Sequence, residues 1–249
     1  MKDLEARMRA REWFHSLTLL PGAWAVVRVD GRSFSRYTEA NFDKPFDPRF
    51  SDLMVDTAAT LLTELGGRYA YTESDEISVV LDPAFDLFGR EVEKLVSLSA
   101  GIATAAFTHA AGAPAVFDGR VWMGTSLGDV VAYLIWRRAD AARCAVNTWS
   151  YWTLRKEGLS ARRATRELER ASAADKKKLL LARGVNFNEV PAWQREGIGL
   201  WWETYEKTGH DPIRDTYVTT TRRRIRTERD LPHDDAYRDH LGAVLRPPA

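Results

Sequence analysis

The feature that most constrains the fold is a short apolar run at residues 24–30, which closes on Asp30 and is followed at once by Gly31. Its valines are typical of a buried β-strand, because β-branched side chains fit the pleated surface of a sheet. Runs with helical spacing and runs with strand-like alternation follow it along the chain. We predict strand, helix, strand, strand, helix and strand at residues 24–30, 49–65, 68–71, 77–81, 88–111 and 115–123. This order predicts an α+β fold with a palm-like, ferredoxin-like βαββαβ core.

The second half of the chain has a different pattern, with a long helical stretch, a polar helical segment, a loop and a C-terminal β-hairpin. No break rich in proline, glycine or serine separates the halves. We therefore expect residues 1–125, a catalytic core with an N-terminal helix, and residues 126–249, a helical appendage with C-terminal strands, to form one structural unit. The additional elements are predicted at residues 2–16, 127–156, 161–181, 184–191, 198–202 and 217–221.

Composition narrows the class of protein. The 249 residues are 45% hydrophobic, which indicates a real core, and the net charge is only +1, so nucleic-acid binding must use a local patch such as Arg222–Arg226. The single Cys144 excludes an intramolecular disulfide, and the five histidines lack the spacing of zinc ligands. No apolar run approaches the roughly 20 residues of a membrane span. We expect a cytoplasmic protein without a membrane partner.

Two carboxylates form the candidate reaction site. Asp30 ends the first strand and Asp75 lies in the turn before the third strand. The first and third strands of a βαββαβ core pair antiparallel, so these residues should lie side by side, with Glu76 as a third acid nearby. Crowded carboxylates repel one another unless cations bridge them, and hard oxygen ligands favour Mg2+. The pattern predicts metal-assisted phosphoryl or nucleotidyl transfer with two ions.

Phosphate binding is expected next to these acids. Gly31 allows a sharp turn, so successive N–H groups of residues 31–35 could face an anionic triphosphate, although an Asp-Gly after a strand is more often a plain turn. A second Asp-Gly-Arg at 118–120 shows how unspecific that tripeptide is by itself. Arg32, Lys44 and Lys94 are candidates to balance the phosphate charge.

Several motifs together resemble the histidine-tRNA guanylyltransferase family and its 3'-to-5' polymerase relatives. The resemblance covers nearly the whole chain. It is carried by Val27–Phe34, Asn41–Asp47, Ser74–Glu76, Phe117–Arg120, Tyr133–Asp140, Ala174–Lys176 and Asn186–Pro191.

The resemblance implies a palm-fold enzyme that activates the 5'-monophosphate of a tRNA with ATP or GTP and then adds a nucleotide there. It implies a homotetramer, and two Mg2+ ions held by Asp30, Asp75 and the Gly31 carbonyl, with Glu76 in support. The residues implied along the nucleotide are Arg32, Ser33, Phe34, Ser35, Lys44 and Ser74. Further candidates for a second triphosphate or the tRNA end are Asp47, Arg90, Lys94, Arg120, Arg143, Lys176, Asn186 and Asn188.

One departure bears on the substrate. Eukaryotic members carry a His-Ile-Asn-Asn-type segment linked to the histidine anticodon, whereas this chain has Ala141–Asn147 there. The chain resembles bacterial and archaeal-type members, which repair truncated tRNA 5' ends by templated addition, and we favour that activity over dedicated G addition at position −1 of histidine tRNA. A nucleotidyl cyclase is a further alternative, but this chain lacks the Gly-Gly-Asp/Glu-Glu-Phe-like turn typical of that class. A non-catalytic RNA-binding module would leave the acids unneutralised near phosphates.

Overall fold

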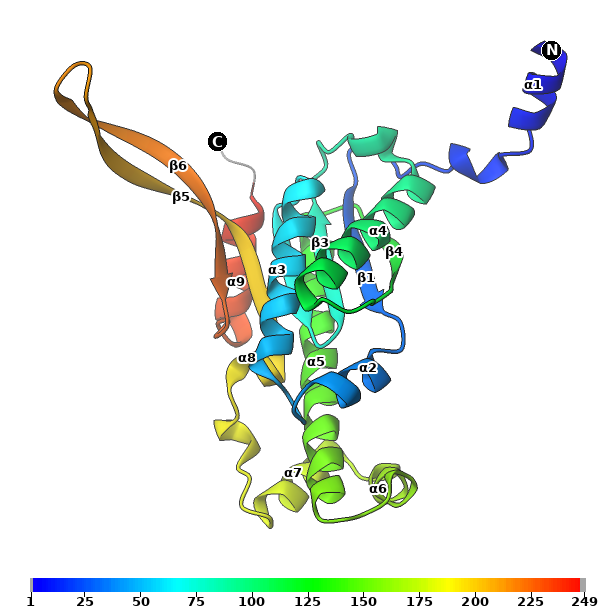
Figure 1. Ribbon diagram of the computed structural model, residues 1–249, viewed down its shortest axis with the longest axis vertical. Helices are drawn as coiled ribbons and strands as arrows, with labels where there is room; N and C mark the ends of the chain where they lie inside the picture. The colour runs from blue at the N-terminus through cyan, green and yellow to red at the C-terminus, as the bar shows by residue number, and fades with distance from the viewer. Residues whose placement is uncertain (1, 247–249) are drawn as a thin grey trace.

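A six-stranded sheet forms the centre of the molecule (Figure 1). The computed structural model describes residues 2–246, apart from the side chain of residue 211; residues 1 and 247–249, the outer ends of the two predicted parts, lie outside it. The strand order is β4-β1-β3-β2-β5-β6 and every pairing is antiparallel. The first four strands have the order of a βαββαβ core, which confirms the predicted α+β, palm-like fold. The strands are β1 Trp24–Gly31, β2 Tyr69–Glu73, β3 Glu76–Leu81, β4 Phe117–Gly124, β5 Ile198–Asp211 and β6 Thr216–Glu228.

Helices cover both faces of this sheet. The helices α3 (Pro48–Glu64) and α4 (Val92–Ala111) pack on one face, and α5 (Leu127–Lys156) and α9 (Asp234–Leu245) pack on the other. The remaining helices are α1 Lys2–Arg9, α2 Phe34–Asn41, α6 Ala161–Leu168, α7 Ala173–Leu181 and α8 Ala192–Glu196, with short 3-10 turns at Trp13–Ser16, Leu87–Arg90 and Phe187–Glu189.

Strand β1 is buried because it has a helical layer on each side. Val27 and Val29 pack in the core under α3 and α4, whereas Trp24 and Val26 pack in the core under α5 and α9. A strand covered on both faces has an almost continuous apolar sequence in place of strict alternation. The continuous apolar run that marked this segment thus has a structural cause.

Local sequence signals set the ends of the main helices. Asp47 caps α3 by accepting the Arg49 N–H at 2.8 Å, and Pro48 occupies the first turn. Ser126 and Asp129 form a capping box at the start of α5. Gly112, at a φ of 65°, ends α4 in the left-handed conformation that glycine adopts without strain.

Some predicted boundaries were wrong. The helix expected at 2–16 is the short α1 followed by a 3-10 turn, and α1 has no buried residue to hold it against the body. The polar segment 161–181 contains two helices, because Ser172 starts α7 with a capping box. The predictions also missed α2, α8 and α9.

The C-terminal hairpin was predicted correctly but is longer than expected. Strand β5 pairs with β2 only through residues 198–201, and its outer part pairs with β6 alone. The two strands join at residues 212–215, so the Gly209–Asp211 segment that was expected to turn belongs to the strand. Figure 1 shows this hairpin projecting from the body.

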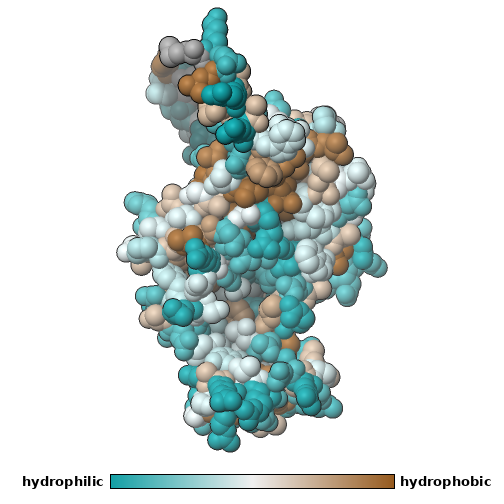
Figure 2. All heavy atoms as spheres, turned by 90° about the vertical axis from the view of Figure 1, so that its right-hand side faces the viewer, coloured by the Kyte–Doolittle hydropathy of each residue, from teal (hydrophilic) through white to brown (hydrophobic). Residues whose placement is uncertain are grey.

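The surface differs from end to end. On the face shown in Figure 2, hydrophobic side chains gather on the upper part of the body, whereas the lower part, to which α6 belongs, is mainly hydrophilic. Trp13 and Phe14 near the N-terminus are 71% and 68% exposed. Among residues 2–246, no helix is long and apolar enough to cross a membrane.

Candidate active site

The end of β1 brings the predicted acids together. In the sheet register, Asp30 lies opposite Glu76 of β3 and opposite Asp118 of β4. Directly opposed residues of antiparallel strands project from the same face, so all three carboxylates point toward the α5 side. The Gly31 N–H donates to the Asp75 carbonyl at 3.0 Å, which ties the turn before β3 to the end of β1. Asp118, which belongs to the Phe117–Arg120 motif but was not predicted as a site residue, thus joins the group.

The electrostatics of these acids favour a bound cation. Burial and the neighbouring Asp30 raise the pKa of Asp75 to about 6. Burial, followed by the charge of Asp118, raises the pKa of Asp30, while Arg120 and Arg28 act in the opposite direction. A divalent cation between Asp30 and Asp75 would remove the repulsion that raises both pKa values. Within residues 2–246, no cluster of three histidine, cysteine or acidic side chains is arranged to hold a metal ion.

The segment after Asp30 is shaped by one close contact. A Cβ on Gly31 would come within 2.4 Å of the Phe34 ring, so only glycine fits there. Phe34 is buried and packs on Phe107 and Phe117 at ring distances of 5.3 and 4.9 Å. Its side chain therefore anchors the loop to the core.

The expected phosphate nest needs a correction. The N–H groups of Gly31 and Arg32 are already bonded, to the carbonyls of Asp75 and Val116. Ser33 has a φ of 64° and caps α2, which begins at Phe34. The N–H groups of Arg36 and Tyr37 donate to the Ser33 carbonyl, so the candidates for binding an anion are those of Phe34 and Ser35 at the start of α2, where a helix favours negative charge. Arg32 and Ser33 have exposed side chains at this end of the helix.

A cavity of about 410 Å³ lies against the turn that carries Asp75. It is bounded by α2, the loop at residues 42–47, the turn before β3, α5 and α8. The predicted residues that line it are Phe34, Ser35, Lys44, Asp47, Ser74 and Asp75. The opposite wall of the cavity was not predicted from the sequence; it includes Ala141, Cys144, Ala145, Thr148, Trp152, Trp193 and Gln194. The spacing of three and four along α5 could have indicated that wall as one helical face.

Lys44 and Asp47 are held in place within this cavity. The Lys44 ammonium donates to the Thr38 hydroxyl and lies 5.6 Å from the centre of the Trp152 ring. Burial lowers the pKa of Lys44, and the charges of Glu39, Asp75 and Asp47 oppose that shift. Hydrogen bonds from the Arg49 side chain contribute most to lowering the pKa of the buried Asp47, to about 2.

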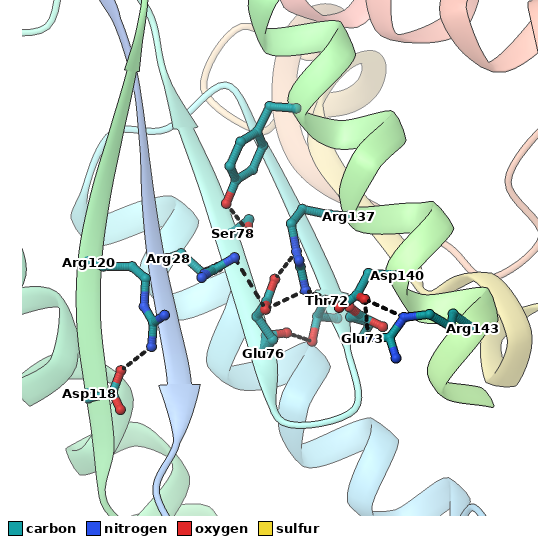
Figure 3. A network of polar contacts seen from close by, with 11 residues as sticks. Arg28, Thr72, Glu73, Glu76, Ser78, Asp118, Arg120, Arg137, Asp140 and Arg143 are labelled. Carbon is teal, nitrogen blue, oxygen red and sulfur yellow. Dashed lines mark hydrogen bonds and ion pairs between the residues drawn. The ribbon is translucent and has the colours of Figure 1, made fainter. Parts of the chain in front are cut away.

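Glu76 has a structural partner of its own (Figure 3). The Arg137 guanidinium of α5 donates to both Glu76 carboxylate oxygens at 2.7 Å, and it also reaches Glu73 and Asp140 at 3.0 Å. Arg28 approaches Glu76 at 3.7 Å. The carboxylate of Glu76 therefore links β3 to α5 next to the site.

The further candidates do not all reach the site. Arg120 lies on β4 beside Asp118, at 3.1 Å, and Arg143 pairs with Asp140 at 2.5 Å. Arg90 lies apart, because its buried guanidinium donates to backbone carbonyls that include those of Leu20 and Ala23. Lys94 pairs with Glu91 on α4.

The last three candidates lie in the helical appendage. Lys176 is on α7, and Asn186 caps the 3-10 turn that contains Asn188. None of the three lines the cavity beside Asp75.

The sheet order and the carboxylate pair at the β1–β3 junction are those expected of a palm-type nucleotidyltransferase. The chain belongs to the tRNAHis guanylyltransferase family: the profile of that family (Thg1) matches residues 5–124, and the profile of its C-terminal domain matches residues 128–238.

Individual relatives agree with this assignment. The chain is 33% identical to a probable tRNA(His) guanylyltransferase of Mus musculus, over 79% of this chain and 70% of the relative, and 33% identical to the Neurospora crassa tRNA(His) guanylyltransferase, over 72% and 67%.

Solved structures agree as well. A bacterial tRNA(His) guanylyltransferase-like protein in complex with GTP has a TM-score of 0.73 and 25% identity, over 98% of this chain and 100% of that one. The Saccharomyces cerevisiae enzyme has a TM-score of 0.69 and 26% identity, over 76% and 90%.

Proposed function

We propose that this protein adds nucleotides to the 5' end of tRNA in the 3'-to-5' direction, and that it repairs truncated tRNAs by templated addition. The observation that carries this proposal is the Asp30–Asp75 pair beside a cavity of about 410 Å³. This volume lies within the range of roughly 300–1,000 Å³ typical of small-molecule sites. The relative described in complex with GTP, and a second structure of such a bacterial protein described in complex with ATP, support a nucleoside triphosphate as the occupant.

In this proposal Asp30, Asp75 and the Gly31 carbonyl hold two Mg2+ ions. The donor set fits, because it offers hard oxygen ligands whose mutual repulsion a cation would remove. Bound Mg2+ would supply charge neutralisation and activation of an attacking oxygen.

The triphosphate would lie between Lys44, Ser35 and Ser74, which line the cavity, and the first turn of α2. Arg32 and Ser33 would meet it at the start of that helix. Glu76 acts through Arg137, because that ion pair fixes the start of β3 and so the position of Asp75.

The choice of templated repair rests on α5. Residues 141–147 lie on or beside the cavity wall, where eukaryotic relatives carry the His-Ile-Asn-Asn-type segment, and this chain has small side chains there at Ala141 and Ala145. The structural likeness to the bacterial protein also extends over 98% of the chain, against 76% for the yeast enzyme. The proposal includes a homotetramer that binds tRNA across subunits, in the cytoplasm.

Dedicated G addition to histidine tRNA is the second candidate. The curated relatives, such as those of mouse and Neurospora crassa, carry this activity in their names. The two candidates differ in substrate and share the reaction site.

Extension of 5'-monophosphorylated tRNAs tests both. Several transcripts that lack their first nucleotide are incubated with Mg2+, ATP and each nucleoside triphosphate, beside intact histidine tRNA. Extension that matches the template in several truncated tRNAs is expected. Addition of G to histidine tRNA alone would replace the proposal with the second candidate, and no addition to any tRNA would overturn both.

A further inference from the structure

A second surface lies on the side of Asp30 away from the cavity. Arg28 of β1 and Arg120 of β4 lie opposite each other in the sheet register, two positions before and after the Asp30–Asp118 pair, and project to the same face. Trp136 of α5 lies next to Arg28, with its ring centre 5.8 Å from the Arg28 guanidinium carbon. Asp75 lines the cavity, whereas Asp30 faces these groups. The carboxylate pair thus separates the two surfaces.

Trp136 is exposed and yet held. It is 53% exposed, although α5 buries a face against the sheet. The Arg137 guanidinium carbon lies 4.6 Å from its ring centre, and Tyr133 contacts it edge to face at 5.6 Å. An exposed indole whose orientation its neighbours set offers a π surface for a nucleic-acid base at little entropic cost.

Arg28 has binding capacity that the protein does not use. Its Nε is buried and has no hydrogen-bond partner among the described residues. The only ion pair formed by its side chain within residues 2–246 is with Glu76 at 3.7 Å, and Arg137 already holds both oxygens of that carboxylate at 2.7 Å. An unpaired buried donor of this kind costs free energy. The Arg28 side chain is 14% exposed, so it must move outward for its guanidinium to meet a phosphate.

We propose that Trp136 is the platform on which the terminal base at the tRNA 5' end stacks, with Arg28 and Arg120 beside it to receive the terminal phosphates. This inference rests on the proposed function. A nucleotide in the cavity covers the Asp75 side, so an RNA end that reacts at the carboxylates must approach from the Asp30 side. That side offers an aromatic surface and guanidinium groups, the chemistry that binds an unpaired or terminal base and its phosphate.

The first test is a spectroscopic one that needs no catalysis. A tRNA acceptor-stem hairpin carries 2-aminopurine as its 5'-terminal base, and a second hairpin carries it inside the stem. The full-length wild-type protein should quench the terminal probe and leave the internal one unchanged. Trp136→Phe should keep most of the quenching and Trp136→Leu should lose it. Trp13→Leu, which alters an exposed tryptophan on the N-terminal 3-10 turn, should behave as wild type.

The second test is kinetic. Trp136→Leu should raise the KM for tRNA about tenfold, since one base–aromatic stack has that order of effect, and should leave the KM for the nucleotide unchanged. Thermal unfolding of both Trp136 variants confirms that they are folded. An equal rise in both KM values would overturn the inference, because it would assign Trp136 to the fold of the whole site.

The outcomes separate this inference from the proposed function. If wild type extends tRNAs while Trp136→Leu retains full quenching of the terminal probe, the platform is wrong and the function stands. If wild type extends no tRNA but the quenching depends on Trp136, the function fails and RNA-end binding stands. A change of oligomeric state in Trp136→Leu with unchanged quenching would make this face a subunit interface and overturn the inference.

Discussion

On the cavity side of the carboxylate pair, two charged groups already have partners: Lys44 donates to Thr38, and Asp47 is held by Arg49. On the opposite side, the Arg28 Nε has no partner among residues 2–246, and Trp136 is half exposed. A pocket for a small ligand benefits from this kind of preorganisation, since fewer groups must be ordered on binding. A surface for an RNA end leaves donors and an aromatic face for the partner to use. The difference indicates that the nucleotide binds on the cavity side and that the RNA end approaches from the side of Arg28 and Trp136.

The largest effect should come from the carboxylates that separate the two sides. Asp30→Asn and Asp75→Asn should each lower the rate of nucleotide addition by at least about 1,000-fold, because removing a metal ligand costs several kcal/mol of transition-state stabilisation. tRNA binding should remain within about threefold of wild type. The measurements are single-turnover extension and filter binding.

Asp239→Asn, on the exposed face of α9, is the matched control for these variants and should retain full activity. Wild-type activity in either Asp30→Asn or Asp75→Asn would refute the metal-site assignment.

The ion pairs of Arg137 with Glu76 and Glu73, next to the carboxylate pair, should contribute to the stability of the fold. In Arg137→Met, Glu76 and Glu73 lose the guanidinium that neutralises them, and removing one partner of a buried ion pair costs about 3–5 kcal/mol. Urea denaturation measures the free energy of unfolding. Arg143→Met is the matched control, since its side chain is 71% exposed and surface pairs contribute about 0–1 kcal/mol. An equal loss of unfolding free energy in the two variants would show that the Arg137 ion pairs do not stabilise the fold more than a surface pair does.

A cavity-side variant should affect the nucleotide and spare the RNA. Lys44→Met should raise the KM for the activating nucleotide by about 10- to 100-fold, the effect of one charge-assisted hydrogen bond to phosphate. The KM for tRNA should change little. Steady-state kinetics with each substrate varied in turn measure the two values.

Lys156→Met, at the exposed end of α5, provides the control for Lys44→Met. A change confined to the KM for tRNA in Lys44→Met would reverse the assignment of the two sides.

The smallest effect is expected on the hairpin, far from both sides. Arg222 has no ion pair with another described residue, whereas Arg224 and Arg226 both pair with Glu203. If Arg222 contacts an RNA phosphate, Arg222→Ala should weaken the binding of every tRNA a few-fold. It should also reduce, by about 1, the slope of the logarithm of the binding constant against the logarithm of the salt concentration. Arg238→Ala on α9 serves as control. An unchanged slope would leave Arg222 as a solvated residue.

Much of the fold was predictable because its signals are local. The apolar run of β1, the helix that starts after Asp47 and the long α5 are set by side-chain periodicity and by caps, which act over a few residues. Helix α2 was missed because its anchor, Phe34, is held by aromatic residues distant in sequence, Phe107 and Phe117. The length of the N-terminal helix was overestimated, and none of the residues of α1 is buried against the body.

The sequence by itself indicated which acids form the site, the βαββαβ order of the core and hence the meeting of Asp30 with Asp75, since antiparallel pairing of β1 and β3 follows from that order. It did not predict that β5 extends the sheet beside β2. Only the tertiary structure showed that Glu76 is engaged by Arg137, that the free N–H groups belong to α2, and that Arg28 and Trp136 lie together. The physical reason is distance along the chain. Contacts between α5 and the sheet join residues far apart in the sequence, such as Arg137 with Glu76 and Trp136 with Arg28, and packing selects these contacts after the local elements have formed.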